Sequence, residues 1–526
     1  MKKETNTRRE FIAKSAVASA GLILGTNTFC SLKTPAVLGQ NDKNSINGVL
    51  RVHPENPRYF TDNSGKVIYL TGSHTWNTLQ DGTFFTTGDT DPPPVFDFTK
   101  YLEFLKLQNH NFIRLWRFES PKFYYWNQVD GEMNRTMGYK FTQPHPWLRT
   151  GPGLAFDEKP KFDLTKFDEE FFIRLRTRII EAGKRGIYVS VMLFEGGELR
   201  CGRIHPEEIS TGWISHPFRL QNNINGIEAD LNNDRRGFEF HSLLNHKITE
   251  LQKAYIQKIV NTVNDLDNII YEVGNEFIYS TENTDWQYWV INYIKEYEAS
   301  MPKQHPVGMT CQMHYPWMRF LPDESRNDVL FNSPADWISP GGFGGRGYLN
   351  DESIPIADGT KVLLFDQDHV WGIGGDKAWV WKSFTRGHNV LNMDPLPEIT
   401  EQISTFSKSP EIRAAMGHTL SYANKMNLAA MTPDSSYASC STTYCLMDPG
   451  KEYLIYQPVL SEYQPVWENN FFVNLFEGEY KFEWFNPTTG QITDKGSVKV
   501  SEVAKRSFKP PFSGDAVLYI KNIKNN

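Results

Sequence analysis

Short apolar runs alternate with amphipathic stretches along most of the chain. Eight runs are short, mostly apolar and rich in β-branched or aromatic residues, as in buried strands: residues 67–72, 112–118, 187–194, 269–274, 307–312, 335–340, 362–365 and 389–393. Between them, stretches such as 99–109 and 246–265 carry apolar residues at three- and four-residue spacing, which is typical of helices. Eight strands alternating with helices predict an α/β fold, a (β/α)8 TIM barrel with long loops after its strands.

A doubly wound open sheet is the alternative arrangement for alternating strands and helices. Its dinucleotide-binding form has a GxGxxG motif that opens a helix after the first strand, and no such motif stands there. The glycine-rich stretch GGFGGRG at 341–347 comes late in the chain and lacks the GK[ST] of a phosphate-binding loop. The pattern therefore favours the barrel.

The pattern changes at Thr432. Helical periodicity stops there, and short alternating runs such as 451–459, 480–487 and 516–523 are separated by Gly, Pro and Asn turns. This change predicts a small antiparallel β-sandwich at residues 432–526, which follows the barrel at residues 41–431.

The first 40 residues have a pattern of their own. Arg8 and Arg9 precede Phe11 and a modestly apolar stretch up to Gly25, an order that resembles a twin-arginine export signal followed by a linker. The stretch is too short and too weakly apolar for a stable membrane span, and no other segment reaches the necessary length. We therefore expect a periplasmic or secreted protein, with surface association through a lipid on Cys30 as the weaker alternative.

Charge and composition exclude some classes of partner. The net charge is −7 with a pI near 6.0, and Lys and Arg are spread along the chain, so we expect neither nucleic acid nor an anionic membrane surface as a partner. Aromatic residues make up 14%, which suits a protein core as well as a surface that stacks on sugar rings. No CxxC pair or His-rich spacing indicates a metal centre, so the sequence predicts no metal and no other cofactor. It leaves the oligomeric state open.

The fourth apolar run, IIYEVGNE at 269–276, ends in polar residues. Ile269, Tyr271 and Val273 suit a buried strand, whereas an acid is costly there unless the strand end opens onto water or a ligand. In a (β/α)8 barrel the catalytic side chains lie at the carboxyl ends of the strands. The other predicted strand ends are also polar and supply further candidates: His74, Trp76, Arg114, Glu195, His314, Tyr315, Asp366, Asp368, His369 and Trp371.

Two carboxyl groups that face one another across a barrel mouth are what glycoside hydrolysis requires. The string GNE at the end of the fourth strand, Arg114 in NFIRLW on the second and an acid at the end of the seventh resemble the clan A (β/α)8 glycoside hydrolases. Within that clan the chain looks most like the apiosidase-like group, whose members also carry a C-terminal β-domain. The resemblance implies a hydrolase of O-glycosidic bonds in plant or algal polysaccharides or their oligosaccharides.

The resemblance also implies roles for single residues. Glu276 corresponds to the acid/base, Asn275 to the residue that hydrogen-bonds the sugar 2-hydroxyl, and Arg114 to the cation that keeps the nucleophile ionised. The remaining candidates are expected to hydrogen-bond to the sugar or to stack on it: His74, Trp76, Glu195, His314, Tyr315, His369 and Trp371.

The seventh strand departs from the clan. Clan members usually present Glu there, whereas this chain reads KVLLFDQDHVWG, with Asp366 at the clan's position and Asp368 on the same face if the strand continues. Aspartate is one methylene shorter than glutamate, so either the backbone advances and the configuration is retained, or a water fits and the configuration is inverted. We expect retention with Asp366 as the nucleophile, and Asp368 is the alternative.

Two other functions stay open. A non-catalytic carbohydrate-binding protein on the same barrel would use the aromatic residues and would tolerate the aspartate. A metal-dependent barrel hydrolase requires several histidines at ligand spacing, and no HxH follows the first strand. The two-carboxylate glycosidase is therefore the function that we expect.

Overall fold

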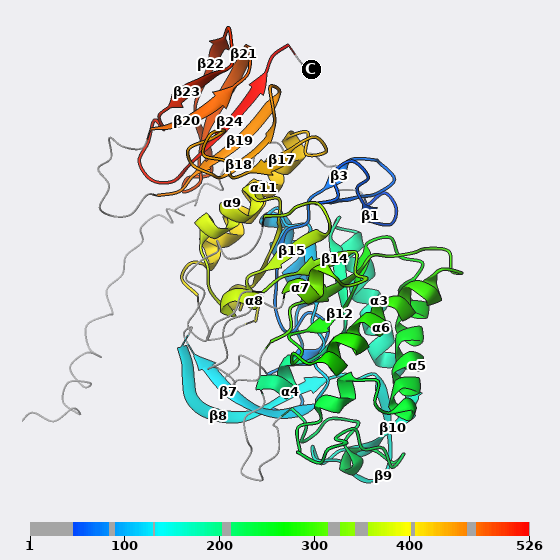
Figure 1. Cartoon of the computed structure of the whole chain (residues 1–526). Coiled ribbons are helices and arrows are strands. Elements are labelled where there is room, and N and C mark those ends of the chain that lie inside the picture. Colours follow the sequence, from blue (N-terminus) through cyan, green and yellow to red (C-terminus); the bar gives the residue numbers. More distant parts are fainter. Residues whose placement is uncertain are drawn as a thin grey trace, which may run out of the picture. The chain divides into compact units, whose positions relative to one another are not determined.

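The computed structural model of the chain, shown in Figure 1, describes residues 46–83, 90–129, 132–201, 212–313, 327–341, 356–400, 406–459 and 470–524. Residues 41–526 form one compact unit. The predicted export segment, His314 and Tyr315 lie outside the described residues. In the part of the chain that is described, no helix is long and apolar enough to cross a membrane.

Eight parallel strands form the central sheet, in the order β4-β16-β15-β14-β13-β12-β11-β6. They are β4 (Gly72–His74), β6 (Phe112–Leu115), β11 (Tyr188–Glu195), β12 (Ile269–Asn275), β13 (Val307–Thr310), β14 (Trp337–Ser339), β15 (Val362–Asp366) and β16 (Asn389–Met393). Neighbouring strands run parallel, so their carboxyl ends meet at one end of the barrel.

The edge strands β4 and β6 close the ring. Asn111, directly before β6, donates its backbone N–H to the carbonyl of Thr71 at 3.0 Å, and its side-chain oxygen accepts the N–H of Thr71 at 2.9 Å. A Cβ on Gly72 would lie 1.9 Å from the carbonyl oxygen of Phe112, so this close approach requires glycine. The predicted TIM barrel is confirmed, with its seam between β4 and β6.

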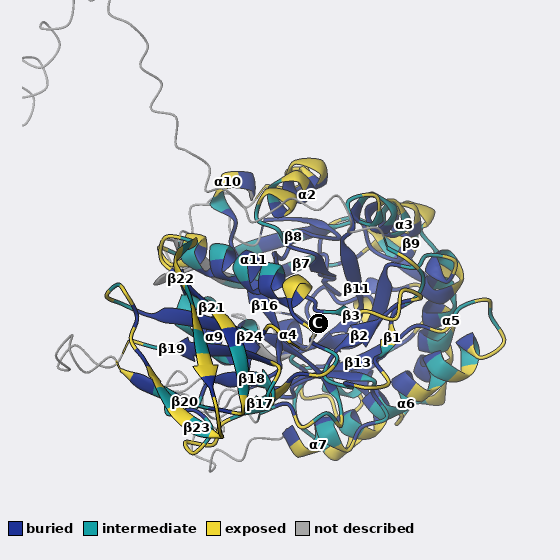
Figure 2. Cartoon of the chain, turned by 90° about the horizontal axis from the view of Figure 1, so that it is seen from above, coloured by how far each residue is buried: buried dark blue, intermediate teal, exposed yellow. Residues whose placement is uncertain are grey.

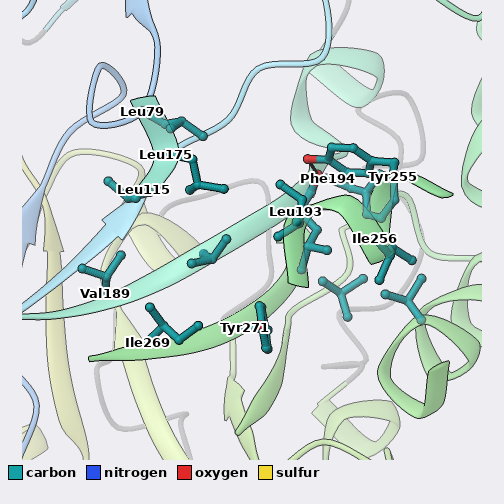
Figure 3. Close-up of a cluster of buried hydrophobic side chains, with 14 of the residues drawn as sticks. Leu79, Leu115, Leu175, Val189, Leu193, Phe194, Tyr255, Ile256, Ile269 and Tyr271 are labelled. Atoms are coloured by element: carbon teal, nitrogen blue, oxygen red, sulfur yellow. Dashed lines mark hydrogen bonds between the residues drawn. The ribbon is translucent and has the colours of Figure 1, made fainter. Parts of the chain in front are cut away.

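Alternation along the strands separates the barrel interior from the outer core. On β11, Leu193 points outward into the apolar cluster of Figure 3, whereas Ser190 points inward and donates to Glu272 at 2.8 Å. On β12, Ile269 and Tyr271 join the same outer cluster. The acid within the fourth strand therefore lies on the inner face, where other polar side chains reach it.

Amphipathic helices cover the outside of the barrel. They are α2 (Phe98–Leu107), α3 (Glu169–Gly183), α5 (His246–Val263), α6 (Thr281–Glu298), α9 (Lys377–Thr385) and α11 (Ser409–Lys425), with the short helices α4 (Gly197–Cys201), η1 (Leu220–Asn222), η2 (Phe238–His241), α7 (Asn327–Phe331), α8 (Asp368–Trp371) and α10 (Pro397–Thr400). Asp168, Asn245 and Ser280 each accept a backbone N–H in the first turn of the helix that follows, which fixes where α3, α5 and α6 begin. Figure 2 shows exposed residues on α5 and α6, whereas β11 and β13 are buried.

The first barrel strand begins later than the sequence predicts. Of the run 67–72, Val67–Ile68 forms β3, which pairs antiparallel with β2 (Phe60–Thr61), and β2 pairs with β1 (Arg51–Val52). Leu70 then packs with Phe60 in a cluster that includes inner residues of the barrel strands. An apolar run does not encode its partner, so one run supplies a short antiparallel strand and the approach to the barrel.

The segment between β6 and α3 forms two antiparallel hairpins. β7 (Lys122–Val129) pairs with β8 (Glu132–Gln143), and β9 (Trp147–Leu154) pairs with β10 (Pro160–Phe167). β5 (Asp81–Gly82), in the loop after β4, adds to the edge of β8. Both insertions follow barrel strands at their carboxyl ends, which is the end that carries the candidate residues.

Two antiparallel sheets follow the barrel and form the predicted C-terminal sandwich. The larger has the order β17-β18-β19-β24-β21-β22, and the smaller pairs β20 with β23. Their bounds are β17 (Thr432–Asp434), β18 (Cys445–Asp448), β19 (Glu452–Gln457), β20 (Phe471–Leu475), β21 (Gly478–Asn486), β22 (Gln491–Val500), β23 (Ala504–Phe508) and β24 (Ala516–Asn522).

Both faces of the larger sheet are covered. Ile455 packs with Val473 of the smaller sheet in one cluster, whereas Tyr456 packs with Trp381 of α9 in another. The rings of Tyr456 and Trp381 are nearly parallel, with centroids 6.3 Å apart. The hydroxyl of Tyr422 on α11 donates to Glu483 of β21 at 3.0 Å. Helices of the barrel and the larger sheet therefore share one hydrophobic core.

Candidate active site

A fully buried arginine, Arg114 of β6, connects the inner faces of three strands. Its Nε and Nη2 donate to the carboxylate of Glu272 on β12, with Nε 3.0 Å from Oε2. Its Nη1 donates to Oδ2 of Asp366, the last residue of β15, and its Nη2 donates to Oδ1 of Asn275, both at 2.8 Å. One cation thus holds two carboxylates and one amide in a fixed arrangement.

The charges of this cluster determine which groups are ionised. Burial by itself lowers the pKa of Arg114, but Glu272 and Asp366 raise that pKa above its usual range. Burial raises the pKa of Asp366, but attraction to His74, the hydrogen bond with His74 and attraction to Arg114 lower it well below its usual value. Asp366 is therefore ionised at neutral pH.

His74, the last residue of β4, contacts the same carboxylate. Its Nε2 lies 2.7 Å from Oδ2 of Asp366, and its ring is nearly parallel to that of Trp116, with centroids 6.2 Å apart. The Nδ1 atom of His74 is buried and has no hydrogen-bond partner among the described residues. Because buried polar atoms are normally hydrogen-bonded, this nitrogen is a place where a ligand hydroxyl can form a hydrogen bond.

Asn275, the last residue of β12, is held from two sides. Its Oδ1 accepts from Arg114 and lies 2.9 Å from Nε2 of His369, and Nδ1 of His369 lies 2.8 Å from Oγ of Ser339 on β14. These contacts fix the orientation of the amide. No described residue accepts a hydrogen bond from its NH2 group, so that group is the end that can donate to a ligand.

Glu276 follows β12 directly and is half-buried. Its φ is 50°, in the left-handed region that residues other than glycine rarely adopt. Such backbone persists where the surroundings hold it and is common at functional sites. Two glycines after β11 fit against it: a Cβ on Gly196 would lie 2.5 Å from Cα of Phe277, and a Cβ on Gly197 would lie 3.5 Å from Oε2 of Glu276. Gly196 and Gly197 therefore pack closely against residues 276 and 277.

Asp366 and Asp368 differ in exposure and in contacts. Asp366 is fully buried, and its Oδ1 accepts one hydrogen bond, from the backbone N–H of Asp368 at 3.1 Å. A carboxylate oxygen can accept two, so within the described chain one lone pair of Oδ1 is left. Asp368 is half-buried, and its charge contributes to the raised pKa of Arg114. β15 ends at Asp366 and α8 begins at Asp368, so the two side chains do not share one strand face.

An aromatic cluster lies beside the charged one. The rings of Trp76 and Trp116 meet edge to face with centroids 6.3 Å apart, and the guanidinium of Arg114 lies 5.0 Å from the centre of the Trp116 ring. Phe118, Phe123, Met192 and Met393 complete this cluster. A charged group next to aromatic faces is an arrangement that suits a sugar, which has both hydroxyls and flat apolar faces.

Glu195, the last residue of β11, is buried, and Gly197 lies next to both its carboxyl group and that of Glu276. The carboxyl group of Glu195 accepts the backbone N–H of Gly197 at 2.8 Å and that of Glu198 at 2.7 Å. Burial, together with the nearby charge of Glu119, raises the pKa of Glu195 to about 8, although these hydrogen bonds lower it. Glu195 therefore carries a proton at neutral pH.

The structure brings most of the selected residues to one place. Arg114 contacts Asn275 and Asp366 directly, and His74, His369, Glu276, Asp368, Glu195 and Trp76 lie in the same network or adjoin it. The side chain of Trp371, like all of His314 and Tyr315, lies outside what is described. The site also contains residues that were not among the candidates chosen from the sequence: Glu272, Trp116, Ser190 and Ser339. In the described part of the chain, no group of three or more His, Cys, Asp or Glu side chains could hold a metal ion.

Comparison with known proteins places this geometry on a familiar scaffold. Residues 133–320 match the family model described as Domain of unknown function (DUF6298). The chain is similar to a solved structure titled "Glycoside hydrolase", at 12% identity and a TM-score of 0.51, over 91% of this chain and 98% of that chain. It is also similar to a glycoside hydrolase family 5 structure from Bacteroides vulgatus ATCC 8482, at 13% identity and a TM-score of 0.49, over 91% of this chain and 94% of that chain. No curated protein matches the chain. At 12% identity the first likeness shows a shared fold.

Proposed function

We propose that the protein is an exported glycoside hydrolase that cleaves O-glycosidic bonds in plant or algal polysaccharides or their oligosaccharides. The observation that carries the proposal is a pair of acids in unlike environments. Asp366 is ionised and held by Arg114 and His74, and Glu276 is half-buried at the end of β12, next to the amide that Arg114 also holds. Two carboxyl groups with different environments are what a double displacement requires. The fold shared with the structure titled "Glycoside hydrolase" supports the proposal.

In the first step of the proposed reaction, a lone pair of Asp366 Oδ1 attacks the anomeric carbon of the sugar. The bond from that carbon to the leaving oxygen breaks, and its electron pair goes to the oxygen, which takes a proton from Glu276. The product of this step is a glycosyl ester of Asp366. The low pKa of Asp366 keeps the attacking oxygen ionised and makes the carboxylate a good leaving group afterwards.

In the second step, water attacks the same carbon. Glu276, now ionised, takes a proton from that water, and the ester bond to Asp366 breaks with its electron pair returning to the carboxylate. Both residues end in their starting states. Arg114 stays bound to Glu272 throughout, so it does not need to move when the charge on Asp366 is lost and regained.

Other residues of the cluster are assigned to sugar binding. The NH2 group of Asn275 is the donor for the 2-hydroxyl, because its oxygen is taken by Arg114 and His369. Nδ1 of His74 is assigned to a hydrogen bond with a further hydroxyl, which can either donate or accept. Trp76, which is 7% exposed, is assigned to stacking on the apolar face of the ring, and Trp116, which is 3% exposed, packs behind it.

A carbohydrate-binding protein without catalysis is the second candidate. One observation favours it, because Asp366 is fully buried and attack requires its Oδ1 to reach the sugar. The exposed fraction of Asp368 favours the inverting variant of the enzyme instead, in which a carboxylate activates water.

The first experiment measures turnover and stereochemistry together. The purified protein is mixed with a panel of 4-nitrophenyl glycosides and oligosaccharides, and the anomeric signals of the first-formed product are followed by NMR. We expect a product with the anomeric configuration of the substrate. Glu276→Gln is expected to lower kcat by about 10²–10⁴-fold, since it removes the acid/base. The matched control is Glu282→Gln, an exposed residue in the first turn of α6, which should not change turnover. Binding without turnover, unchanged by Glu276→Gln, would support the second candidate.

Variants of the two aspartates then assign the nucleophile. Asp366→Asn should lower turnover at least as much as Glu276→Gln and should stop formation of the glycosyl ester, whereas Asp368→Asn should retain the stereochemical outcome. A product of inverted configuration together with a larger loss for Asp368→Asn would assign catalysis to Asp368.

Export is tested separately. Replacing Arg8 and Arg9 by Lys should hold the full-length chain in the cytoplasm of a host with a twin-arginine pathway, measured by fractionation. Unchanged export of this variant would contradict a twin-arginine signal without touching the glycosidase proposal.

A further inference from the structure

Three buried glutamates beside the candidate site form a closed ring of hydrogen bonds. The backbone N–H of Glu119 donates to Oε2 of Glu198 at 2.8 Å, the N–H of Glu198 to Oε2 of Glu195 at 2.7 Å, and the N–H of Glu195 to Oε1 of Glu119 at 3.1 Å. Each residue therefore donates from its backbone to the side chain of the next. The exposed fractions are 0% for Glu119, 2% for Glu195 and 7% for Glu198, so water contributes little to these contacts.

The ring joins the chain segments that follow two barrel strands. Glu119 comes after β6, Glu195 ends β11, and Glu198 lies in α4. Two further backbone groups, the N–H of Ser120 and the N–H of Gly197, donate to ring carboxylates at 3.1 Å and 2.8 Å. The ring therefore connects two loops at the carboxyl end of the barrel by hydrogen bonds.

The same loops form the surface against which Glu276 packs. The N–H of Gly196 donates to the carbonyl of Asn275 at 2.8 Å, which ties the residue after Glu195 to the residue before Glu276. A Cβ on Gly197 would lie 2.6 Å from Oε1 of Glu195 and 3.5 Å from Oε2 of Glu276, so this glycine separates the two carboxyl groups. Any shift of the ring therefore acts directly on the position of residue 276.

The groups that face the ring supply few positive charges. Arg117 donates to Glu119 at 3.3 Å, and Nε2 of His216 and of His241 lie 3.0 Å and 3.2 Å from its two oxygens. Burial lowers the pKa of His216 despite its contact with Glu119. Burial raises the pKa of Glu119, but His241, His216 and Arg117 together lower it by more than burial raises it. Glu119 is therefore the ionised member of the ring. The carboxyl group of Glu276, directly after β12, also lies near Glu195.

The other two members of the ring are protonated. Burial raises the pKa of Glu195 to about 8, and burial with the charge of Glu119 raises that of Glu198 well above its usual value. Oε1 of Glu198 is buried without a hydrogen-bond partner among the described residues, which fits a neutral carboxyl group better than a carboxylate. The folded ring therefore contains one carboxylate and two carboxylic acids at neutral pH.

We propose that Glu195 is a positioning residue for Glu276: through the Glu119–Glu195–Glu198 ring it holds Gly196 and Gly197 against residue 276 and so fixes the carboxyl group in the barrel mouth. The structural role concerns only the ring and the backbone at 275–277. The catalytic consequence rests on the proposed function. Because two members must stay protonated, the ring loosens as pH rises and Glu195 ionises next to Glu119, Glu198 and Glu276.

The experiment uses hydrogen–deuterium exchange of the full chain, which requires no substrate. Peptides that contain residues 195–199 and 275–278 are compared in the wild type, Glu195→Gln and Glu195→Ala at pH 6.5 and pH 9, after correction for the intrinsic exchange rate. We expect Glu195→Ala to accelerate exchange in both peptides by tenfold or more at pH 6.5. Glu195→Gln cannot ionise but has one acceptor oxygen for the two backbone N–H groups of Gly197 and Glu198. Its exchange at pH 6.5 should therefore lie between that of the wild type and that of Glu195→Ala, and it should not rise further at pH 9, where that of the wild type does. Glu296→Gln, an exposed residue of α6, is the matched control and should behave as the wild type.

Two results would overturn the proposal. One is unchanged exchange at 275–278 in Glu195→Ala, and the other is equal loosening of the wild type and Glu195→Gln between pH 6.5 and pH 9. If Glu195→Ala does not fold, the comparison of the wild type with Glu195→Gln decides by itself.

A parallel measurement of kcat uses the 4-nitrophenyl glycoside with the highest turnover. Glu195→Ala should lower kcat at least tenfold with KM within threefold, and Glu195→Gln, which keeps one of the two acceptor oxygens, should restore kcat in part and extend activity to higher pH. A KM effect alone would contradict positioning of Glu276. If the exchange results are as expected but Glu276→Gln keeps full activity, the positioning role of the ring is supported and the proposed function is rejected.

Discussion

The carboxyl groups of Asp366 and Glu195 are both buried at the carboxyl end of the barrel, yet their pKa values move in opposite directions. Burial raises both. Asp366 has Arg114 and His74 within hydrogen-bond distance, and their effect exceeds that of burial. Glu195 has two backbone N–H groups, and the carboxyl groups around it oppose its ionisation.

Side-chain hydrogen-bond donors and positive charges within reach therefore decide which buried acid is ionised. In the second cluster, Arg117, His216 and His241 all contact Glu119, so their effect is concentrated on one carboxylate. The result is an ionised aspartate at the end of β15 and a neutral surface beside Glu276. That asymmetry suits a reaction in which one acid attacks and another donates a proton.

Removal of the cation from the first cluster should lower the stability of the protein more than any other change considered below. Arg114→Met leaves Glu272 and Asp366 buried without their shared partner. We expect the free energy of unfolding to fall by about 3–5 kcal/mol, because an unpaired buried charge costs more than the pair contributes. Urea unfolding at pH 7, followed by tryptophan fluorescence, measures the loss.

The control for this variant is an exposed ion pair. Arg176 and Asp265 have side-chain exposed fractions of 37% and 61%, so Arg176→Met should cost less than about 1 kcal/mol. Equal losses for the two variants would mean that the network around Arg114 does not depend on its charge. If Arg114→Met does not accumulate, Arg114→Lys retains the charge without the fork and should lie between the two.

The pH dependence of stability should separate the two clusters. The pKa of Glu195 is raised, so its contribution is present below the usual glutamate pKa and is lost as pH rises through about 8. The pKa of Asp366 is lowered, so its contribution is present above the usual aspartate pKa and is lost as pH falls. Each proton changes the free energy of unfolding by at most about 1.4 kcal/mol per pH unit.

Two isosteric variants test which residue causes the loss of stability at high pH and which causes the loss at low pH, that is, the alkaline and acidic limbs of the curve of unfolding free energy against pH. Glu195→Gln should flatten the decline of unfolding free energy between pH 6 and pH 9, and Asp366→Asn should flatten the decline on the acidic side. Urea titrations at several pH values give both curves. A flattened alkaline limb in Asp366→Asn, or a flattened acidic limb in Glu195→Gln, would reverse the comparison.

The barrel could be predicted from sequence because its signals are local. Each of the eight strands contains part of a predicted apolar run or adjoins one, and strand β12 with its polar end needed only the eight letters IIYEVGNE. The first strand was displaced because Val67 and Ile68 look the same whether their partner is parallel or antiparallel. A second limit lies in β19, where Ile455 and Tyr456 belong to different cores and burial of both faces removes the alternation.

The site was predictable only where a strand end marked it. Glu276, Asn275 and Asp366 occupy such positions, so the sequence selected them. Glu272 stood in the same strand, but its partner Arg114 is far away in sequence and no local pattern joins them. The ring around Glu195 depends on backbone donors, and donors of that kind have no signature in side-chain identity.

Gly196 and Gly197 test how the segment after β11 holds residue 276, and Gly196 tolerates a Cβ less well than Gly197. A Cβ there would lie 2.5 Å from Cα and 2.8 Å from N of Phe277, and backbone atoms cannot give way by rotation. Gly196→Ala should therefore lower the free energy of unfolding by about 1–3 kcal/mol and reduce turnover with it. Urea unfolding and kcat measure the two effects, and a neutral outcome would mean that the segment after β11 does not hold residue 276.

Gly197→Ala should have the smallest effect and the most selective one. Its Cβ would meet Oε1 of Glu195 at 2.6 Å, which is the end of a side chain and can move, at a cost of less than about 1 kcal/mol. Moving that oxygen breaks its hydrogen bond with the N–H of residue 197, so turnover should fall several-fold while Asp366 and Arg114 are untouched. The measurement is kcat at pH 6 in Gly197→Ala with and without Glu195→Ala. Equal fold losses of kcat in the two backgrounds would contradict the argument, because Glu195→Ala removes the oxygen that the added methyl meets.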